Sequence, residues 1–217
     1  IKQPKFGHKK DGLTKIEVQK VQKEITKIKD KAMRLKVNAM FDLLSKRGLR
    51  VGELVNIELK EINFTNLTIN VRRKGNEEKE LIDIFSSTAA ILKTYIDYCN
   101  IDGIYLFPKN KKQAISVRSI QKYFSAPKYG LFAKAGVHKS KTVHGLRHYA
   151  ITTALQAFNG DLEKTRQFSG HANVTMIQVY NMLRKKMDLK KTPLNPDNIA
   201  QHFYTHYPDY PVTKLSV

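Results

Sequence analysis

Apolar residues recur every three or four positions through the first part of the chain, which is the spacing of one face of a helix. In the first run they are Val18, Val21, Ile25 and Ile28, and in the second they are Met33, Val37, Met40, Phe41 and Leu44. Thr14 and Glu17 precede and open the first run with the spacing of a capping box. We therefore expect two amphipathic helices, the second ending near Gly48, and a shorter helix from Val51 to Leu59.

The pattern then changes to alternation between apolar and polar residues. The apolar positions are Leu67, Ile69 and Val71 and, after a turn at Lys74–Gly75–Asn76, Leu81, Ile82, Ile84 and Phe85. This pattern is typical of a β-hairpin. Helical patterns return from Ser86 to about Cys99, from Ser116 with an interruption at Pro127, from Val143 to Phe158, and near Leu162 and Val174. The sequence thus predicts an α+β fold that is mainly α-helical, with a small antiparallel β-sheet.

The charge of the chain points to a polyanionic partner. Lys and Arg total 39 of the 217 residues against 19 Asp and Glu, so the formal net charge is +20. Clustered cations attract phosphates, which favours nucleic acid. A membrane is not indicated, because no apolar run approaches the roughly 20 residues needed to cross a bilayer. The basic stretches 109–112 and 184–191 could each be a solvated loop or a phosphate contact.

The composition also predicts how the chain is organised. Residues 1–12 are basic and lack an apolar period, so we interpret them as a linker ahead of one domain over residues 13–192. Residues 193–217 are rich in proline and aromatic residues and could dock on their own domain or be exchanged between subunits. The single cysteine, Cys99, cannot form an internal disulfide, which fits a reducing, intracellular compartment.

Three polar motifs carry candidate chemistry. The stretch HGLRH places His144 and Arg147 three residues apart on a predicted helix, so both side chains project from one face and can grip one phosphate. Alone this is a weak signal, because a half-buried histidine beside a surface arginine is common in basic proteins. The stretch GLRVGEL places Arg50 at a helix start, where backbone N–H groups favour an anion. The third, SGHANVTMIQVY, contains His171 and Tyr180.

Taken together, these positions resemble those of one family. In chain order they are Arg50, Lys74 in the predicted hairpin turn, His144, Arg147, His171 and Tyr180. Their order and surroundings resemble the catalytic domain of the tyrosine recombinase, or phage integrase, family over residues 13–183. One departure is Phe168–Ser169 before the glycine, where a leucine is more usual. The resemblance implies the family's catalytic fold and an enzyme that cuts and rejoins DNA without a metal ion, ATP or another cofactor.

The expected chemistry centres on Tyr180. A phenol has an ordinary pKa of about 10, so it needs nearby positive charge and a proton acceptor to become a nucleophile. We expect Arg50 and Arg147 to hold the scissile phosphate and to neutralise the charge that builds on it in the transition state. His144 is placed to help remove the phenolic proton. The product of cleavage would be a 3′-phosphotyrosyl bond.

The remaining roles are implied by the resemblance. Lys74 would protonate the leaving 5′ oxygen, and His171 would donate a hydrogen bond to the phosphate. Glu53 would orient the site from behind Arg50. Three neighbouring cations are alternatives to Lys74: Arg72, Arg73 and Lys79. His148 and Tyr149 are expected to act as packing or supporting residues.

Two other functions stay open at this point. A type IB topoisomerase uses similar tyrosine chemistry, although its expected pattern has lysine where His144 stands. A non-catalytic DNA-binding regulator could use the same basic surface, although phosphate binding alone requires no nucleophile. For a recombinase, the resemblance implies a double-stranded DNA recombination site, a homotetramer in the synaptic complex, and an N-terminal domain that clamps the DNA. The motifs do not distinguish integration, excision, dimer resolution and inversion.

Overall fold

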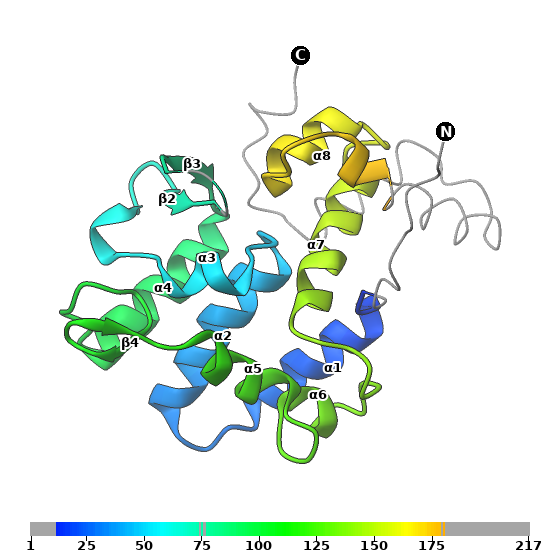
Figure 1. The fold of residues 1–217 in the computed structure, drawn as a ribbon. Coiled ribbons are helices and arrows are strands. Elements are labelled where there is room, and N and C mark those ends of the chain that lie inside the picture. Colours follow the sequence, from blue (N-terminus) through cyan, green and yellow to red (C-terminus); the bar gives the residue numbers. More distant parts are fainter. Residues whose placement is uncertain (1–11, 74, 76, 179, 181–217) are drawn as a thin grey trace.

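The computed structural model describes residues 12–73, 75, 77–178 and 180 (Figure 1). Its elements are α1 (Lys15–Thr26), α2 (Lys31–Ser45), α3 (Val51–Val55), the 3₁₀ turn η1 (Leu59–Glu61), β1 (Ile62–Asn63), β2 (Thr68–Arg72), β3 (Lys79–Asp83), α4 (Ser86–Cys99), β4 (Pro108–Asn110), β5 (Gln113–Ala114), α5 (Val117–Ser125), α6 (Leu131–Lys134), α7 (His144–Ala157) and α8 (Leu162–Ser169). Helices dominate, and the strands pair antiparallel in two small sheets, so the predicted mainly helical α+β fold is confirmed. Among these residues no helix combines the length and apolar character that a bilayer crossing requires.

The first two helices begin and end as their sequence predicts. The Thr14 side chain accepts a hydrogen bond from the Glu17 N–H at 3.2 Å, and the Glu17 carboxylate accepts from the Thr14 N–H at 2.7 Å, which is the expected capping box. Helix α2 ends at Ser45, and Gly48 then adopts a φ of +69°, a conformation that glycine reaches without steric cost. The resulting turn directs the chain into α3.

The helix predicted from Val51 to Leu59 is shorter than expected. Helix α3 ends at Val55, and Ile57 and Leu59 instead make backbone hydrogen bonds to the segment just before β4. The Ile57 carbonyl accepts from the Leu106 N–H at 2.9 Å, and the Leu59 N–H donates to the Ile104 carbonyl at 2.9 Å. These hydrogen bonds to a distant segment replace those of a continued helix, which the local pattern alone favours. That part of the prediction was therefore wrong.

The predicted hairpin is present and carries one more strand than expected. In β2 and β3, Ile69 pairs with Ile82 and Asn70 with Leu81, so Ile69 and Ile82 are buried while Leu81 faces outward. Strand β1 adds to the outer edge of β2, giving the order β1-β2-β3. The basic stretch 109–112, for which only charge was noted, forms the β4–β5 hairpin.

Helix α7 links the main core to a smaller one (Figure 1). Its boundaries match the prediction, with Val143 and Phe158 as flanking cap residues. Near its start, Leu146 packs in the large cluster that includes α1 and α2. The second cluster is formed by Ile151, Leu155, Ile177 and Tyr180, with Leu162 packed against it. The helix therefore presents Arg147 at the level where the two cores meet.

Candidate active site

Of the predicted site residues that the structure describes, Arg147 is the most deeply buried, with only 1% of its surface exposed. One terminal nitrogen, Nη1, donates to the Gly48 carbonyl, and the other, Nη2, donates to the Ser169 carbonyl at 2.9 Å. The guanidinium thus joins α7 to the turn before α3 and to the end of α8. Burial and the nearby Arg50 charge lower the pKa of Arg147 to about 10, which still leaves it charged at neutral pH.

Glu53 has a buried carboxylate that lies within 4.0 Å of the side chains of three arginines. Its Oε1 accepts a hydrogen bond from Arg50 Nη1 at 2.7 Å, and its Oε2 accepts from the Arg50 backbone N–H at 2.8 Å. Arg73 Nη1 donates to the same Oε2 at 3.2 Å, and Arg147 Nη1 lies 4.0 Å from it. Burial alone would raise the pKa of Glu53, but Arg73, Arg50 and Arg147 together lower it below its ordinary value.

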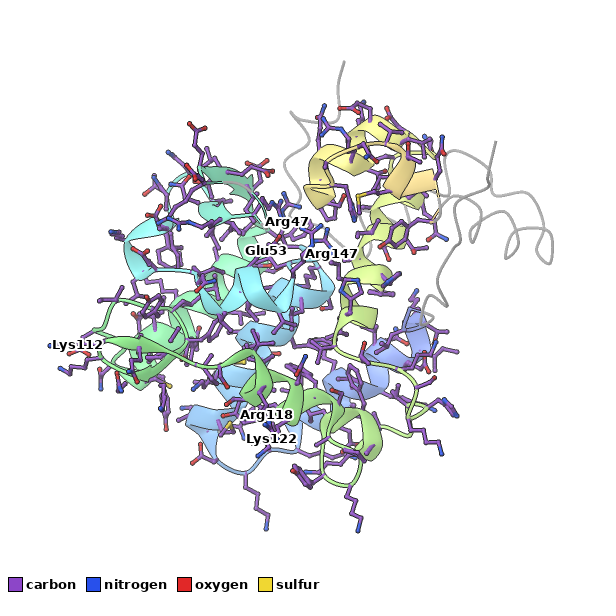
Figure 2. All side chains as sticks on the ribbon, in the orientation of Figure 1. Arg47, Glu53, Lys112, Arg118, Lys122 and Arg147 are labelled. Atoms are coloured by element: carbon purple, nitrogen blue, oxygen red, sulfur yellow. The ribbon has the colours of Figure 1, made fainter. Side chains whose placement is uncertain are left out.

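The arrangement around Glu53 leaves one arginine facing outward. The Arg50 side chain is 25% exposed, whereas those of Glu53 and Arg147 are almost completely covered. Figure 2 shows Glu53 and Arg147 close together between the α3 side and the α7–α8 side of the molecule. A phosphate that reached Arg50 would therefore meet a guanidinium already held by a buried carboxylate.

His171 follows the left-handed Gly170 that ends α8. Its Nε2 lies 3.4 Å from Arg147 Nη2, and its Nδ1 lies 2.6 Å from the Ser169 hydroxyl oxygen. Because an arginine only donates, Nε2 is the acceptor in the first contact, and Nδ1–H is then the donor to Ser169. The Ser169 hydroxyl in turn donates a hydrogen bond to the Arg166 carbonyl at 3.2 Å, which leaves its oxygen free to accept from Nδ1–H and is consistent with that assignment.

Tyr180 and three histidines form a row of rings beside this cluster. The Tyr180 ring lies 5.1 Å from the His148 ring and 6.0 Å from the His171 ring, and His148 also meets His144 edge-on at 4.9 Å. Tyr180 is 3% exposed. Burial raises the pKa of its phenol, while the charges of Arg147 and Arg50 act in the opposite direction.

The comparisons with known proteins identify the family of this chain. Residues 12–187 match the model of the phage integrase family. The chain belongs to this family. Tyrosine recombinase XerC of Escherichia coli O127:H6 is 31% identical over 150 residues, which are 67% of this chain and 48% of the relative. The chain spans about half the length of the curated relatives it matches.

Solved structures of recombinases share the fold. XerA recombinase superposes with a TM-score of 0.65 at 25% identity, over 94% of this chain and 68% of the other. XerH recombinase bound to a palindromic difH substrate, in a post-cleavage complex, superposes with a TM-score of 0.71 at 21% identity, over 87% of this chain and 54% of the other. The second likeness shows the fold alone.

Within the phage integrase fold, the structure brings most of the predicted residues together. Arg50, Glu53, Arg147 and His171 are linked by the contacts above, and Tyr180 lies next to His171. His144 is exposed at the first turn of α7, where it contacts His148, so a residue expected only to support the site lies between two predicted catalytic groups. Lys74 lies outside the described residues.

The alternatives to Lys74 have different surroundings. Lys79 pairs with Glu61 at 2.6 Å and with Glu58 at 3.3 Å, two carboxylates at the 3₁₀ turn that precedes β1. Arg72 is exposed at the end of β2, whereas Arg73 is buried against Glu53. The Arg73 side chain therefore belongs to the active-site cluster, although its position in the sequence suggested only a substitute for Lys74.

Arg47 is a second residue whose place the sequence did not reveal. It lies in the turn between α2 and α3, near Glu53 in Figure 2. Its Nε donates to the Asp83 carbonyl at 2.8 Å, and its Nη1 donates to the Phe168 carbonyl. The motif RGLR contains both Arg47 and Arg50, but nothing in it distinguishes a buried arginine from an exposed one. Among the described residues, no group of three His, Cys, Asp or Glu side chains could hold a metal ion.

Proposed function

We propose that this chain is the catalytic domain, over residues 13–192, of a site-specific DNA recombinase that cuts and rejoins strands through Tyr180. The observation that carries the proposal is the Glu53-centred cluster, in which Arg50 and Arg147 are held a short distance from each other beside His171 and Tyr180. Two fixed guanidinium groups next to a tyrosine suit the transfer of a phosphoryl group to a phenol.

In the first step, the Tyr180 oxygen attacks the phosphorus of a DNA phosphodiester. A bond from the phenolic oxygen to phosphorus forms, and the bond from phosphorus to the 5′ oxygen breaks. The phenolic proton passes toward His144, and Lys74 supplies a proton to the departing 5′ oxygen. Arg50 and Arg147 neutralise the developing charge on the non-bridging oxygens, which stabilises the transition state.

In the second step, the 5′ hydroxyl of another strand attacks the phosphotyrosyl bond. The bond from phosphorus to the Tyr180 oxygen breaks, the attacking 5′ hydroxyl gives its proton to Lys74, and the Tyr180 oxygen recovers its proton from His144. One phosphodiester thus replaces another and the bond energy is conserved. The reaction balances without a metal ion, ATP or another cofactor. His171, held by Ser169, would donate to the phosphate after taking up a proton at Nε2, because that nitrogen is the acceptor in its contact with Arg147.

The partners follow from this chemistry. The substrate would be a double-stranded DNA recombination site in the cytoplasm of a prokaryote or of a host cell, and a homotetramer would join two such sites. Residues 193–217, which lie outside the described residues, would dock on their own domain or be exchanged between subunits. Two structural neighbours support the same partner, since XerH is bound to a difH substrate and the Tn1549 integrase to transposon right end DNA.

Two alternatives receive less support. A topoisomerase-like enzyme would relax supercoiled DNA of any sequence, whereas the phage integrase family match and His144 favour a recombinase. A regulator without catalysis would leave the nearness of Tyr180 to Arg147 and His171 without a purpose.

The test is capture of the covalent intermediate. The protein is incubated with nicked duplexes that have a randomised core, from which a short cleaved strand can diffuse away. Adducts stable in detergent are recovered, their DNA is sequenced, and the modified peptide is mapped. We expect linkage at Tyr180, a preferred DNA sequence, and no adduct with Tyr180→Phe despite retained DNA binding. An adduct at wild-type level with Tyr180→Phe, or relaxation of plasmids without sequence preference, would overturn the proposal.

A further inference from the structure

We propose that Arg73 is a positioning residue of the active site, holding both the Glu53 carboxylate behind Arg50 and the glycine turn that carries His171. The proposal rests on the proposed function, since it assigns Arg73 to the same reaction. Three independent sets of contacts place the Arg73 guanidinium between these two parts of the site.

The first contact fixes Glu53. Arg73 Nη1 donates to Glu53 Oε2 at 3.2 Å, and that same oxygen accepts the Arg50 backbone N–H at 2.8 Å. With one oxygen held in this way, the other oxygen, Oε1, faces the Arg50 guanidinium at 2.7 Å. Arg73 therefore acts on Arg50 through the orientation of Glu53. A carboxylate with only one partner could rotate and release Arg50.

The second contact anchors Arg73 to the sheet. Its Nε and Nη2 donate to the two carboxylate oxygens of Glu80 at 3.0 and 3.4 Å, and Glu80 is paired with Val71 in the β2–β3 ladder. The Arg73 side chain is only 4% exposed, while that of Glu80 is 39% exposed. A fork of donors that spans two carboxylates is specific to arginine, because lysine offers a single nitrogen.

The third contact is with the turn at the end of α8. A Cβ placed on Gly170 would collide with the Cζ and Nε atoms of Arg73, so the guanidinium lies directly on the glycine backbone. Gly170 has a φ of +62°, and the next residue is His171. Glycine is thus required here both for its conformation and for the space that Arg73 occupies.

These contacts also explain why Arg73 itself does not grip the phosphate. Its Nε, Nη1 and Nη2 all donate to carboxylates, and 3% of the residue is exposed. Its charge is offset by Glu53 and Glu80, which makes the burial of a guanidinium tolerable. Arg73 is also the leading positive charge that keeps the pKa of Glu53 low against the effect of burial.

The test is a double-mutant cycle with Arg73→Met, Glu53→Gln and the double variant, using the DNA recovered by covalent capture. The rate of adduct formation is measured at saturating DNA in a single turnover, and Kd is measured separately. If Arg73 acts through Glu53, each single change slows the rate about 10- to 100-fold with Kd little changed, and the double variant is no slower than the worse single. Arg73→Lys, which keeps the charge but loses the fork, should recover part of the rate.

The matched control is Arg118→Met, which removes an exposed arginine of α5 that lies away from Glu53 in Figure 2 and should leave the rate within about two-fold of wild type. A wild-type rate for Arg73→Met, or losses that multiply in the double variant, would overturn the inference.

Melting temperatures of the four proteins of the cycle, which are wild type, Arg73→Met, Glu53→Gln and the double variant, provide a readout that does not depend on cleavage. Shifts that fail to add in the double variant support the Arg73–Glu53 coupling even if wild type forms no adduct on any duplex, an outcome that refutes the proposed function alone. Additive shifts contradict the coupling.

Discussion

Arg47 lies over the ring of Phe168, with its guanidinium carbon 4.4 Å from the ring centroid. The same arginine donates hydrogen bonds to the backbone of Phe168 and to the Asp83 carbonyl at 2.8 Å. One side chain therefore connects the turn before α3, the end of β3 and helix α8. The contact also gives a reason for a phenylalanine at the position before Ser169, where the family pattern usually differs.

Replacement of Arg47 should destabilise the protein as a whole. Arg47→Ala removes a charged donor from two partly buried backbone carbonyls and a cation from an aromatic face, so we expect the free energy of unfolding to fall by about 2–4 kcal/mol. Phe168→Leu removes only the ring and should cost about 1 kcal/mol. Urea unfolding measures both, and combining them should cost less than the sum of the two. Full additivity would indicate that the two side chains do not act as a pair.

Arg147→Lys should separate charge from geometry at the candidate active site. Lysine keeps the positive charge but cannot donate at once to the Gly48 and Ser169 carbonyls, which the planar fork of Arg147 reaches. We expect adduct formation with Tyr180 to slow by about 100-fold or more, while Kd for DNA changes by less than about five-fold. Single-turnover cleavage and a binding titration provide the two numbers. A weaker Kd with an unchanged cleavage rate at saturating DNA would mean that Arg147 contributes only to DNA binding.

Local pattern predicted much of this fold because the relevant signals are themselves local. The capping box of Thr14 and Glu17 and the boundaries of α7 depend on residues a few positions apart. The helix expected over 51–59 failed because Ile57 and Leu59 bond to a segment far along the chain. The β4–β5 hairpin was missed since its basic residues show no alternating apolar pattern.

The same distinction applies to the candidate active site. Arg50, Arg147 and Tyr180 could be found because each lies in a recognisable motif. The roles of Arg47 and Arg73 could not be found, because their partners come from strands and helices that only the tertiary structure brings near. In a chain with 39 Lys and Arg, one more arginine carries no signal until its burial is known.

Glu53 should give the protein a measurable acid sensitivity. Arg73 and Arg50 hold the pKa of its carboxyl below the ordinary value of 4.5 although burial opposes this. A group whose pKa is lowered by folding contributes stability above its unfolded pKa and loses that contribution as pH falls through the folded one. The difference in unfolding free energy between wild type and Glu53→Gln should therefore be largest near neutral pH and shrink below about pH 4.5.

Urea unfolding at a series of pH values from neutral to about 3 tests this directly. The control is Glu163→Gln. Hydrogen bonds from Arg166 and Gln167 lower the pKa of Glu163 to about 2, but Glu163 is exposed, so its removal should have little effect on stability at any pH. A Glu53→Gln difference that stayed constant across the range would show that the carboxylate charge does not stabilise the fold.

Ser169→Ala should impair His171 without disturbing the rest of the site. The Ser169 hydroxyl lies 2.6 Å from His171 Nδ1 and favours the tautomer with the hydrogen on Nδ1. In this tautomer Nε2 carries no hydrogen and accepts from Arg147. Without the hydroxyl the imidazole can rotate, so we expect adduct formation to slow about 10-fold with Kd unchanged. Nitrogen NMR of the histidine rings should show a mixture of tautomers in place of one. The exposed Ser140, 2.8 Å from His138 Nδ1, provides a matched control, and Ser140→Ala should leave the cleavage rate at its wild-type value. Equal rates for the two serine variants would mean that His171 does not depend on Ser169 for its orientation.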